Sequence, residues 1–144
     1  MNITFVKKIW TAVDTFSDGY TSISEPVAVE GPHGIDCLKV TVAVGYGDDS
    51  IGRMDVLFPV PRRNPFPSTL LQFAPRTNVL SASFVIHGED GDVAGDWLAG
   101  SSENAQISRD AKLATAWSNL LRDIEWYVMS DLAARGLQAM AEVD

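Results

Sequence analysis

The chain has 144 residues, of which 46% are hydrophobic and 21% are charged, a composition typical of one globular domain. Its formal net charge of −8 argues against general nucleic-acid binding, because neutralisation of phosphates dominates that affinity. One cysteine and two histidines exclude an internal disulfide and a multi-cysteine zinc site, and they argue against a histidine-rich metal site. We therefore expect a single domain over residues 1–144, mostly β in 1–98 and helical in 103–143, with no metal or cofactor.

The N-terminal segment carries two conflicting patterns. Apolar side chains recur there at helical spacing, at Val6, Ile9, Trp10, Val13 and Phe16. However, Ile9–Phe16 is rich in β-branched and aromatic residues, Asp18-Gly19 is a typical hairpin turn, and Tyr20–Ser24 is a candidate returning strand. We predict an N-terminal β-hairpin. The order of apolar residues and lysines before it lacks the pattern of a signal peptide, so we expect none.

Three later segments alternate between apolar and polar residues, which is the period of a strand with one buried face. They are Leu38–Val44, Arg53–Val60 and Asn78–His87. The glycine-rich turn Gly45–Gly52 joins the first two into an antiparallel hairpin. Repeated prolines predict a long loop over Pro61–Arg76, because proline cannot donate to a sheet ladder. Val93–Leu98 fits either a short strand or a loop.

The segment from Glu103 to Val143 contains no proline and is predicted to be helical. As one straight helix, its 41 residues would span about 60 Å, whereas a compact domain of this size has a radius of gyration of about 14–15 Å. The segment must therefore fold back or reach onto another subunit. We predict two helices, Glu103–Arg122 and Ile124–Arg135, with Gly136 as a C-terminal cap and Ser102 or Ser108 as an N-terminal cap.

The order of these elements is hairpin, two strands, long loop, strand and two helices. The residues that carry the pattern are Lys39–Val44, Arg53–Pro61, Asn78–Ile86 and, in the tail, Arg109, Leu113, Leu120 and Leu121. Over about two-thirds of the chain, this pattern resembles that of the coat proteins of single-stranded RNA bacteriophages (levivirus-like).

The resemblance implies an α+β fold, in which an N-terminal β-hairpin and an antiparallel meander sheet precede two C-terminal helices. In that family the helices pack across the sheet of a partner subunit, which gives an interlocked homodimer. Such dimers assemble into an icosahedral shell, and the other face of the sheet binds genomic single-stranded RNA. The implied function is a non-enzymatic virion coat (capsid) protein with no membrane partner, located in the virion and assembled in the cytoplasm of a bacterial host.

The same resemblance assigns roles to individual residues. The implied RNA-binding residues are Lys39, Thr41, Ala43, Arg53, Asp55, Ser81 and Ser83. The implied loop at the symmetry axes includes Arg62, Arg63, Pro65 and Pro67. The implied dimer interface consists of Leu113, Trp117, Leu120, Leu121, Ile124 and Val128. Trp126 and Tyr127 are predicted to be further core or dimer contacts.

Two other functions fit the same sequence. One is a helix-grip domain that binds a small apolar ligand in a pocket lined by Trp117, Trp126 and Leu71. The other is an acidic interaction protein, such as a phage inhibitor of a host factor or a secretion chaperone. An enzyme is the least favoured class, because the residues present assemble no acid–base constellation.

The acidic segment Gly88–Gly100 has the oxygen ligands that calcium prefers. Its acids, Glu89, Asp90, Asp92 and Asp96, lack the spacing of an EF-hand loop, so a solvated acidic turn is the favoured interpretation. His87 beside this segment is available to pair with an acid.

Overall fold

The computed structural model describes residues 3–46, 49–59 and 79–143. Helix α1 (Ile3–Ser17) is followed by strands β1 (Ser22–Ile23) and β2 (Val27–Glu30), the 3-10 turn η1 (Pro32–Gly34), and strands β3 (Asp36–Tyr46) and β4 (Asp49–Pro59). After the undescribed segment 60–78 come strands β5 (Ser81–Gly88) and β6 (Gly91–Leu98) and helices α3 (Ser102–Ser108) and α4 (Ala111–Val143). The predicted α+β class, with an antiparallel sheet followed by C-terminal helices, is confirmed.

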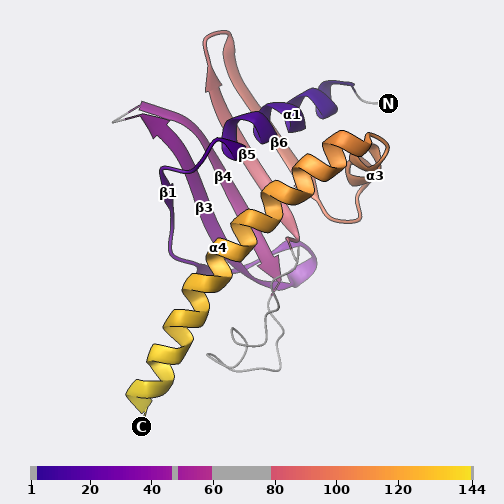
Figure 1. Cartoon of the computed structure of the whole chain (residues 1–144). Coiled ribbons are helices and arrows are strands. Elements are labelled where there is room, and N and C mark those ends of the chain that lie inside the picture. Colours follow the sequence, from indigo (N-terminus) through magenta and orange to yellow (C-terminus); the bar gives the residue numbers. More distant parts are fainter. Residues whose placement is uncertain (1–2, 47–48, 60–78, 144) are drawn as a thin grey trace.

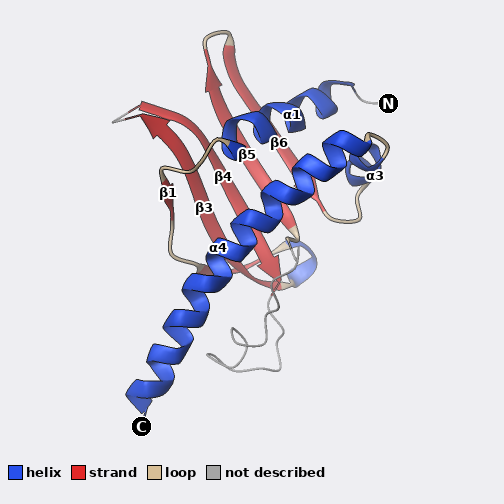
Figure 2. Ribbon diagram, in the orientation of Figure 1, coloured by secondary structure: helices blue, strands red, loops and turns tan. Residues whose placement is uncertain are grey.

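The strands form one six-stranded antiparallel sheet in the order β1-β3-β4-β5-β6, and β2 also pairs with β3 (Figure 2). The three predicted strands are present, and the uncertain segment around Val93–Leu98 is strand β6. β3 and β4 pair along their length, so Thr41 lies opposite Asp55 and Val42 opposite Met54. This register determines which side chains of neighbouring strands lie side by side on each face of the sheet.

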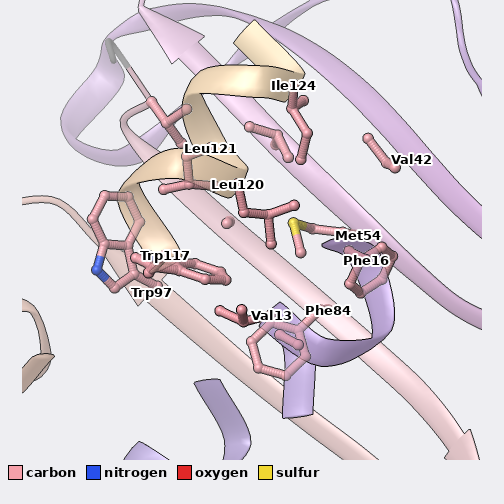
Figure 3. Close-up of a cluster of buried hydrophobic side chains, with 14 of the residues drawn as sticks. Val13, Phe16, Val42, Met54, Phe84, Trp97, Trp117, Leu120, Leu121 and Ile124 are labelled. Carbon is pink, nitrogen blue, oxygen red and sulfur yellow. The ribbon is translucent and has the colours of Figure 1, made fainter. Parts of the chain in front are cut away.

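Both α1 and the first half of α4 lie across the same face of the sheet (Figure 1). The side chains beneath them are buried, as the alternation in the sequence predicts: Val40, Val42, Met54, Val56, Phe58, Ala82, Phe84 and Ile86. Figure 3 shows Phe16 and Val13 from α1 and Leu120 and Ile124 from α4 within one cluster on this layer. The hydrophobic core therefore sits between one face of the sheet and two helices.

Two tryptophans from different elements contact each other in this core. Trp97 of β6 and Trp117 of α4 pack edge-on with their ring centroids 6.0 Å apart, and Trp117 also packs edge-on against Phe84. Both indole N–H groups are buried without an acceptor, and an unpaired buried donor costs about 1–3 kcal/mol. The burial and mutual packing of the two rings offset that cost.

The predicted N-terminal β-hairpin is wrong, because Ile9–Phe16 belongs to helix α1. Phe5, Ile9, Val13 and Phe16 recur at helical spacing, and the helix buries all four against the sheet. Gly19 has a φ of +118°, a conformation that favours glycine, and it follows the end of the helix. The Asp18-Gly19 pair therefore ends a helix, and the chain reaches the sheet only at β1.

The predicted break in the C-terminal helices is misplaced. The break lies at residues 109–110 rather than at Asp123, and α4 continues through Asp123 and Gly136 to Val143. Side-chain caps explain the position. Asn104 N–H donates to Ser101 Oγ at 3.2 Å at the start of α3, and Leu113 N–H donates to Asp110 Oδ1 at 3.0 Å at the start of α4. Ser101 and Asp110, not Ser102 or Ser108, are the caps.

Asp110 gives a direct test of this break. Asp110→Ala is expected to lower the free energy of unfolding by about 1 kcal/mol, because the first turn of α4 loses an acceptor. Asp110→Asn keeps an oxygen at the same place and is expected to retain most of the stability. Urea denaturation followed by circular dichroism measures both. Equal destabilisation by the two substitutions would show that the hydrogen bond to the side-chain oxygen of residue 110 does not stabilise the start of α4.

Tyr20 generates a pH dependence at the alkaline end. Burial, with a smaller contribution from the nearby Asp123, raises the pKa of Tyr20 from 10.0 to about 12. The folded state holds this proton more tightly than the unfolded chain. The contribution to stability is therefore complete below pH 10 and is lost as the pH rises toward 12. Denaturation midpoints across this range are expected to fall less in Tyr20→Phe than in the unmodified chain, and parallel curves would refute the assignment.

Candidate functional site

The face of the sheet opposite the helices is bare in the described part of the chain, and its side chains form rows across the strands. One row holds Lys39, Leu57, Ser81 and Leu98. The next holds Thr41, Asp55, Ser83 and Asp96, and the third holds Ala43, Arg53, Val85 and Ala94. All seven predicted RNA-binding residues therefore lie together on this surface, which we call the bare face, although their role in binding stays a prediction.

Asp55 is the electrostatic centre of the bare face. Its Oδ1 accepts a hydrogen bond from Thr41 Oγ1 at 2.6 Å, and its Oδ2 lies 3.6 Å from Arg53 Nη2. The Arg53 side chain is 63% exposed, so this ion pair is weak in energy but still screens the guanidinium from an incoming anion. Two of the predicted RNA contacts, Thr41 and Arg53, are thus engaged by a third, Asp55.

The described side chains of the bare face do not carry a net positive charge. Lys39 and Arg53 stand against the carboxylates of Asp55, Asp92 and Asp96, so the described charges leave a small negative excess. A hydroxyl- and acid-bearing surface of this kind makes hydrogen bonds readily but attracts phosphate poorly. Among the described side chains of these rows, a polyanion would find two cations, Lys39 and Arg53.

The bare face is hollowed over β4, β5 and β6. An open depression of about 900 Å³ has Arg53, Asp55, Ser83, Val85 and Asp96 in its lining, and it also reaches Lys8 and Phe5 of α1 at the helix side. Lys39, Thr41, Ala43 and Ser81 lie outside this lining. The predicted residues therefore divide between the hollow and the flatter part of the face over β3.

The acidic hairpin between β5 and β6 contains one specific side-chain pair. His87 Nδ1 lies 2.9 Å from Asp92 Oδ1, with both side chains largely exposed. Among the described residues, no three His, Cys, Asp or Glu side chains gather closely enough to hold a metal ion. The hairpin is therefore described best as a solvated acidic turn.

Other sequence-selected residues have structural roles or lie outside the described chain. Cys37 is buried, its thiol contacts the Ile35 carbonyl, and burial raises the pKa of Cys37, which disfavours a reactive thiolate. Arg62, Arg63, Pro65, Pro67 and Leu71 lie outside the described residues. In the part of the chain that is described, no helix is long and apolar enough to span a membrane.

The residues predicted for the dimer interface are buried in a single copy of the chain, and their role in a dimer stays a prediction. All six are at most 3% exposed in a single copy of the chain: Leu113, Trp117, Leu120, Leu121, Ile124 and Val128. They pack onto the sheet of their own chain, because the capped start of α4 places this stripe directly over Phe84 and Met54 (Figure 3). In a single copy these residues form part of the hydrophobic core.

Two large aromatic side chains are instead exposed on α4. Trp126 is 60% exposed and Tyr127 is 59% exposed, although both are described residues of a helix whose inner side is fully buried. Trp117 faces the core and Trp126 faces away from it, so the two do not line the common pocket that a helix-grip domain requires. Periodicity contains this information, because Trp126 lies outside the i, i+3, i+4 stripe of the apolar residues.

Glu125 is a buried residue that the sequence analysis missed. It is wholly buried on α4 between the core positions Ile124 and Val128. A carboxylate is expected at the surface from its hydropathy alone. Helical spacing contains a signal for its burial, because Glu125 lies four residues after Leu121 and three before Val128 on the buried side of the helix.

Comparison with known proteins adds no family to this description: no family model matches the chain, and no similar curated protein or solved structure is found.

Asp55 provides a test of the electrostatic description. Asp55→Asn removes the carboxylate beside Arg53 but leaves an oxygen that accepts from Thr41. The bare face then carries one more net positive charge, and binding to a polyanion is expected to strengthen. The measurement is the salt concentration that elutes each variant from immobilised heparin. Asp14→Asn, on α1, changes the net charge equally and is the control. Equal shifts for both variants would mean that only net charge, and not the bare face, matters.

Proposed function

We propose that the chain is a non-enzymatic coat protein that assembles with itself into a shell around RNA, with the bare face of the sheet directed inward. One observation carries this proposal: the described helices cover a single face of the sheet, and the last helix runs past the end of that sheet (Figure 1). A shell subunit needs one surface for the cargo and a separate element for neighbouring subunits. The bare face and α4 meet these two needs.

The length of α4 supports self-assembly. Its 33 residues span about 50 Å, whereas the 11-residue strands β3 and β4 span about 37 Å. Since α4 also crosses the sheet diagonally, its C-terminal part extends beyond the sheet (Figure 1). A short helical segment in water is marginally stable, so a helix that leaves its own domain gains from contact with another chain.

The bare face supports weak RNA contact that does not depend on sequence. Lys39 and Arg53 supply the phosphate contacts, and Ser81, Ser83 and Thr41 supply hydroxyls for sugars or bases. With two cations, the logarithm of the affinity for a single strand is expected to fall with the logarithm of the salt concentration with a slope no steeper than about −1.5. A strongly basic RNA-binding surface would give a much steeper dependence.

The acidic interaction protein is the second candidate, and the bare face favours it in one respect. Asp55 and Asp96 lie in the row next to that of the exposed apolar side chain of Val85. Mixed apolar and acidic surfaces suit a basic segment of a protein partner better than a phosphate backbone. A protein partner would then replace RNA as the ligand of the same face.

Assembly of the purified chain separates these functions. The proposal predicts that the expressed protein elutes as a large particle, appears as closed shells in negative-stain electron microscopy, and protects RNA from nuclease. A soluble dimer or monomer without particles, which captures one host protein, would support the second candidate and contradict the first. Asp55→Asn is expected to increase the RNA content of the particles, measured as the ratio of absorbance at nucleic-acid and protein wavelengths.

A further inference from the structure

We propose that the outward side of α4 is the surface on which a second copy of this chain docks, with the two α4 helices antiparallel and Lys112 of each copy facing Asp123 of the other. This inference rests on the self-assembly proposed above and identifies the surface responsible. The side chains that form the surface recur at alternating steps of four and three residues, which places them on one side of a helix. We call them the outer stripe: Lys112, Ala116, Asn119, Asp123, Trp126 and Ser130.

Exposure is the first argument. On the inner side of α4, Leu113, Trp117 and Leu120 are nearly inaccessible, so the core of a single copy is complete there. Trp126 points the opposite way, with 60% of its surface in water. Tryptophan is strongly enriched in protein interfaces, because burying it removes a large apolar area from water with few rotatable bonds to fix. An exposed tryptophan on an otherwise polar helix side therefore marks a contact surface.

The second argument is charge complementarity of the outer stripe with itself. Lys112 lies near the start of α4 and Asp123 lies 11 residues later, about three helical turns along the same side, and both are exposed. If two copies pack antiparallel, Lys112 of each faces Asp123 of the other, so the same ion pair forms twice. A parallel arrangement would place Lys112 against Lys112 and Asp123 against Asp123, which is unfavourable. The charges therefore specify a two-fold, antiparallel partner of the same sequence.

The same register gives Trp126 a cationic partner. When Lys112 faces Asp123, Trp126 lies beside the beginning of the partner's α4, where the chain turns from α3 into α4. Arg109 is an exposed residue at the corner between α3 and α4. A guanidinium beside an indole ring is attracted by the negative face of the ring, and arginine pairs with tryptophan in this way more often than lysine does. The basic beginning of one α4 thus meets the acidic and aromatic part of the other.

Shape gives a further argument for this register. At its centre, Ala116 of each copy faces Asn119 of the other, and these short side chains allow two helices to approach closely. The Ser130 hydroxyl already donates to the Trp126 carbonyl at 2.9 Å, so covering Ser130 costs no hydrogen bond. Every facing pair in the register is therefore either complementary in charge or small.

The occupant is a second copy rather than a separate protein, because one register satisfies the charges, the tryptophan and the small residues together. The helix also passes in front of the sheet (Figure 1), and Lys112, Asn119 and Trp126 on its outward side are exposed in a single copy. Antiparallel pairing of residues 112–123 also directs the C-terminal part of each α4 toward the α3 end of its partner.

Charge reversal tests the pairing. Lys112→Asp and Asp123→Lys are each expected to weaken dimerisation, and the double variant is expected to restore it because the pair is rebuilt with reversed polarity. Analytical ultracentrifugation of the full chain over a range of concentrations gives the dissociation constants. Because Asp123 also lies near Tyr20, thermal melts establish that each variant is folded at the temperature used. If the double variant does not dimerise more tightly than both single variants, the antiparallel register is wrong.

Trp126→Glu tests the aromatic contact. Loss of the two symmetry-related contacts is expected to raise the dissociation constant by about 30-fold or more, while the circular dichroism of the monomer stays unchanged because Trp126 is outside the core. Lys7→Gln, at an exposed position of α1, lowers the net charge by the same amount and is the control, which is expected to dimerise normally. An unmodified chain that stays monomeric, or a Trp126→Glu variant that dimerises normally, would overturn the inference.

The outcomes for the interface and for the shell are distinguishable. If the chain forms dimers that dissociate on Trp126→Glu substitution but forms no particles, the α4 surface is supported and the coat function is contradicted. If the Trp126→Glu variant forms particles and its dimers have the same dissociation constant as those of the unmodified chain, the coat function is supported and the α4 surface is contradicted.

Discussion

Burial of α1 and α4 on one side of the antiparallel sheet is the interaction on which the rest of this structure depends. Ile9, Phe16, Met54, Trp117 and Ile124 are almost inaccessible, and they come from both helices and the sheet. Because both helices use the same face, the other face stays bare over the described strands. The same packing sets the diagonal course of α4, and that course carries the helix beyond the sheet (Figure 1).

The two surfaces left by this packing differ in chemistry. The bare face mixes hydroxyls, carboxylates and a few cations, and Asp55 holds both Thr41 and Arg53 in local contacts. The outer stripe of α4 begins with a basic residue and continues to an acid and an exposed tryptophan. In an antiparallel pair of helices, this order places the basic residue of each copy opposite the acid of the other. The first surface suits a weakly bound, extended ligand, and the second suits a stable contact with an identical chain. A self-assembling protein requires this division of roles.

The errors of the sequence analysis have specific physical causes. Ile9–Phe16 satisfies both the composition of a strand and the spacing of a helix, and the neighbouring core decides between them because only a helix buries Phe5, Ile9 and Phe16 together. The break before α4 depends on whether Asp110 or a serine accepts the first free N–H groups, and several residues near that point are equally good caps by type. A stripe of apolar residues shows that a helix is buried, but it does not show whether its own sheet or a partner covers it.

Local periodicity in the sequence determined which side chains of β3, β4 and β5 share a face, because successive strand residues point to opposite sides whatever the surroundings. It also determined the inner stripe of α4 and the grouping of Lys39, Thr41, Arg53, Asp55, Ser81 and Ser83 on one surface. Only the tertiary structure decided that the apolar stripe from Leu113 to Val128 is covered by its own sheet, that Asp55 engages Arg53, that Glu125 is buried and that Trp126 points into solvent. These properties depend on distances between segments far apart in the chain, and such distances are set by the packing of the whole core rather than by the pattern of any single segment.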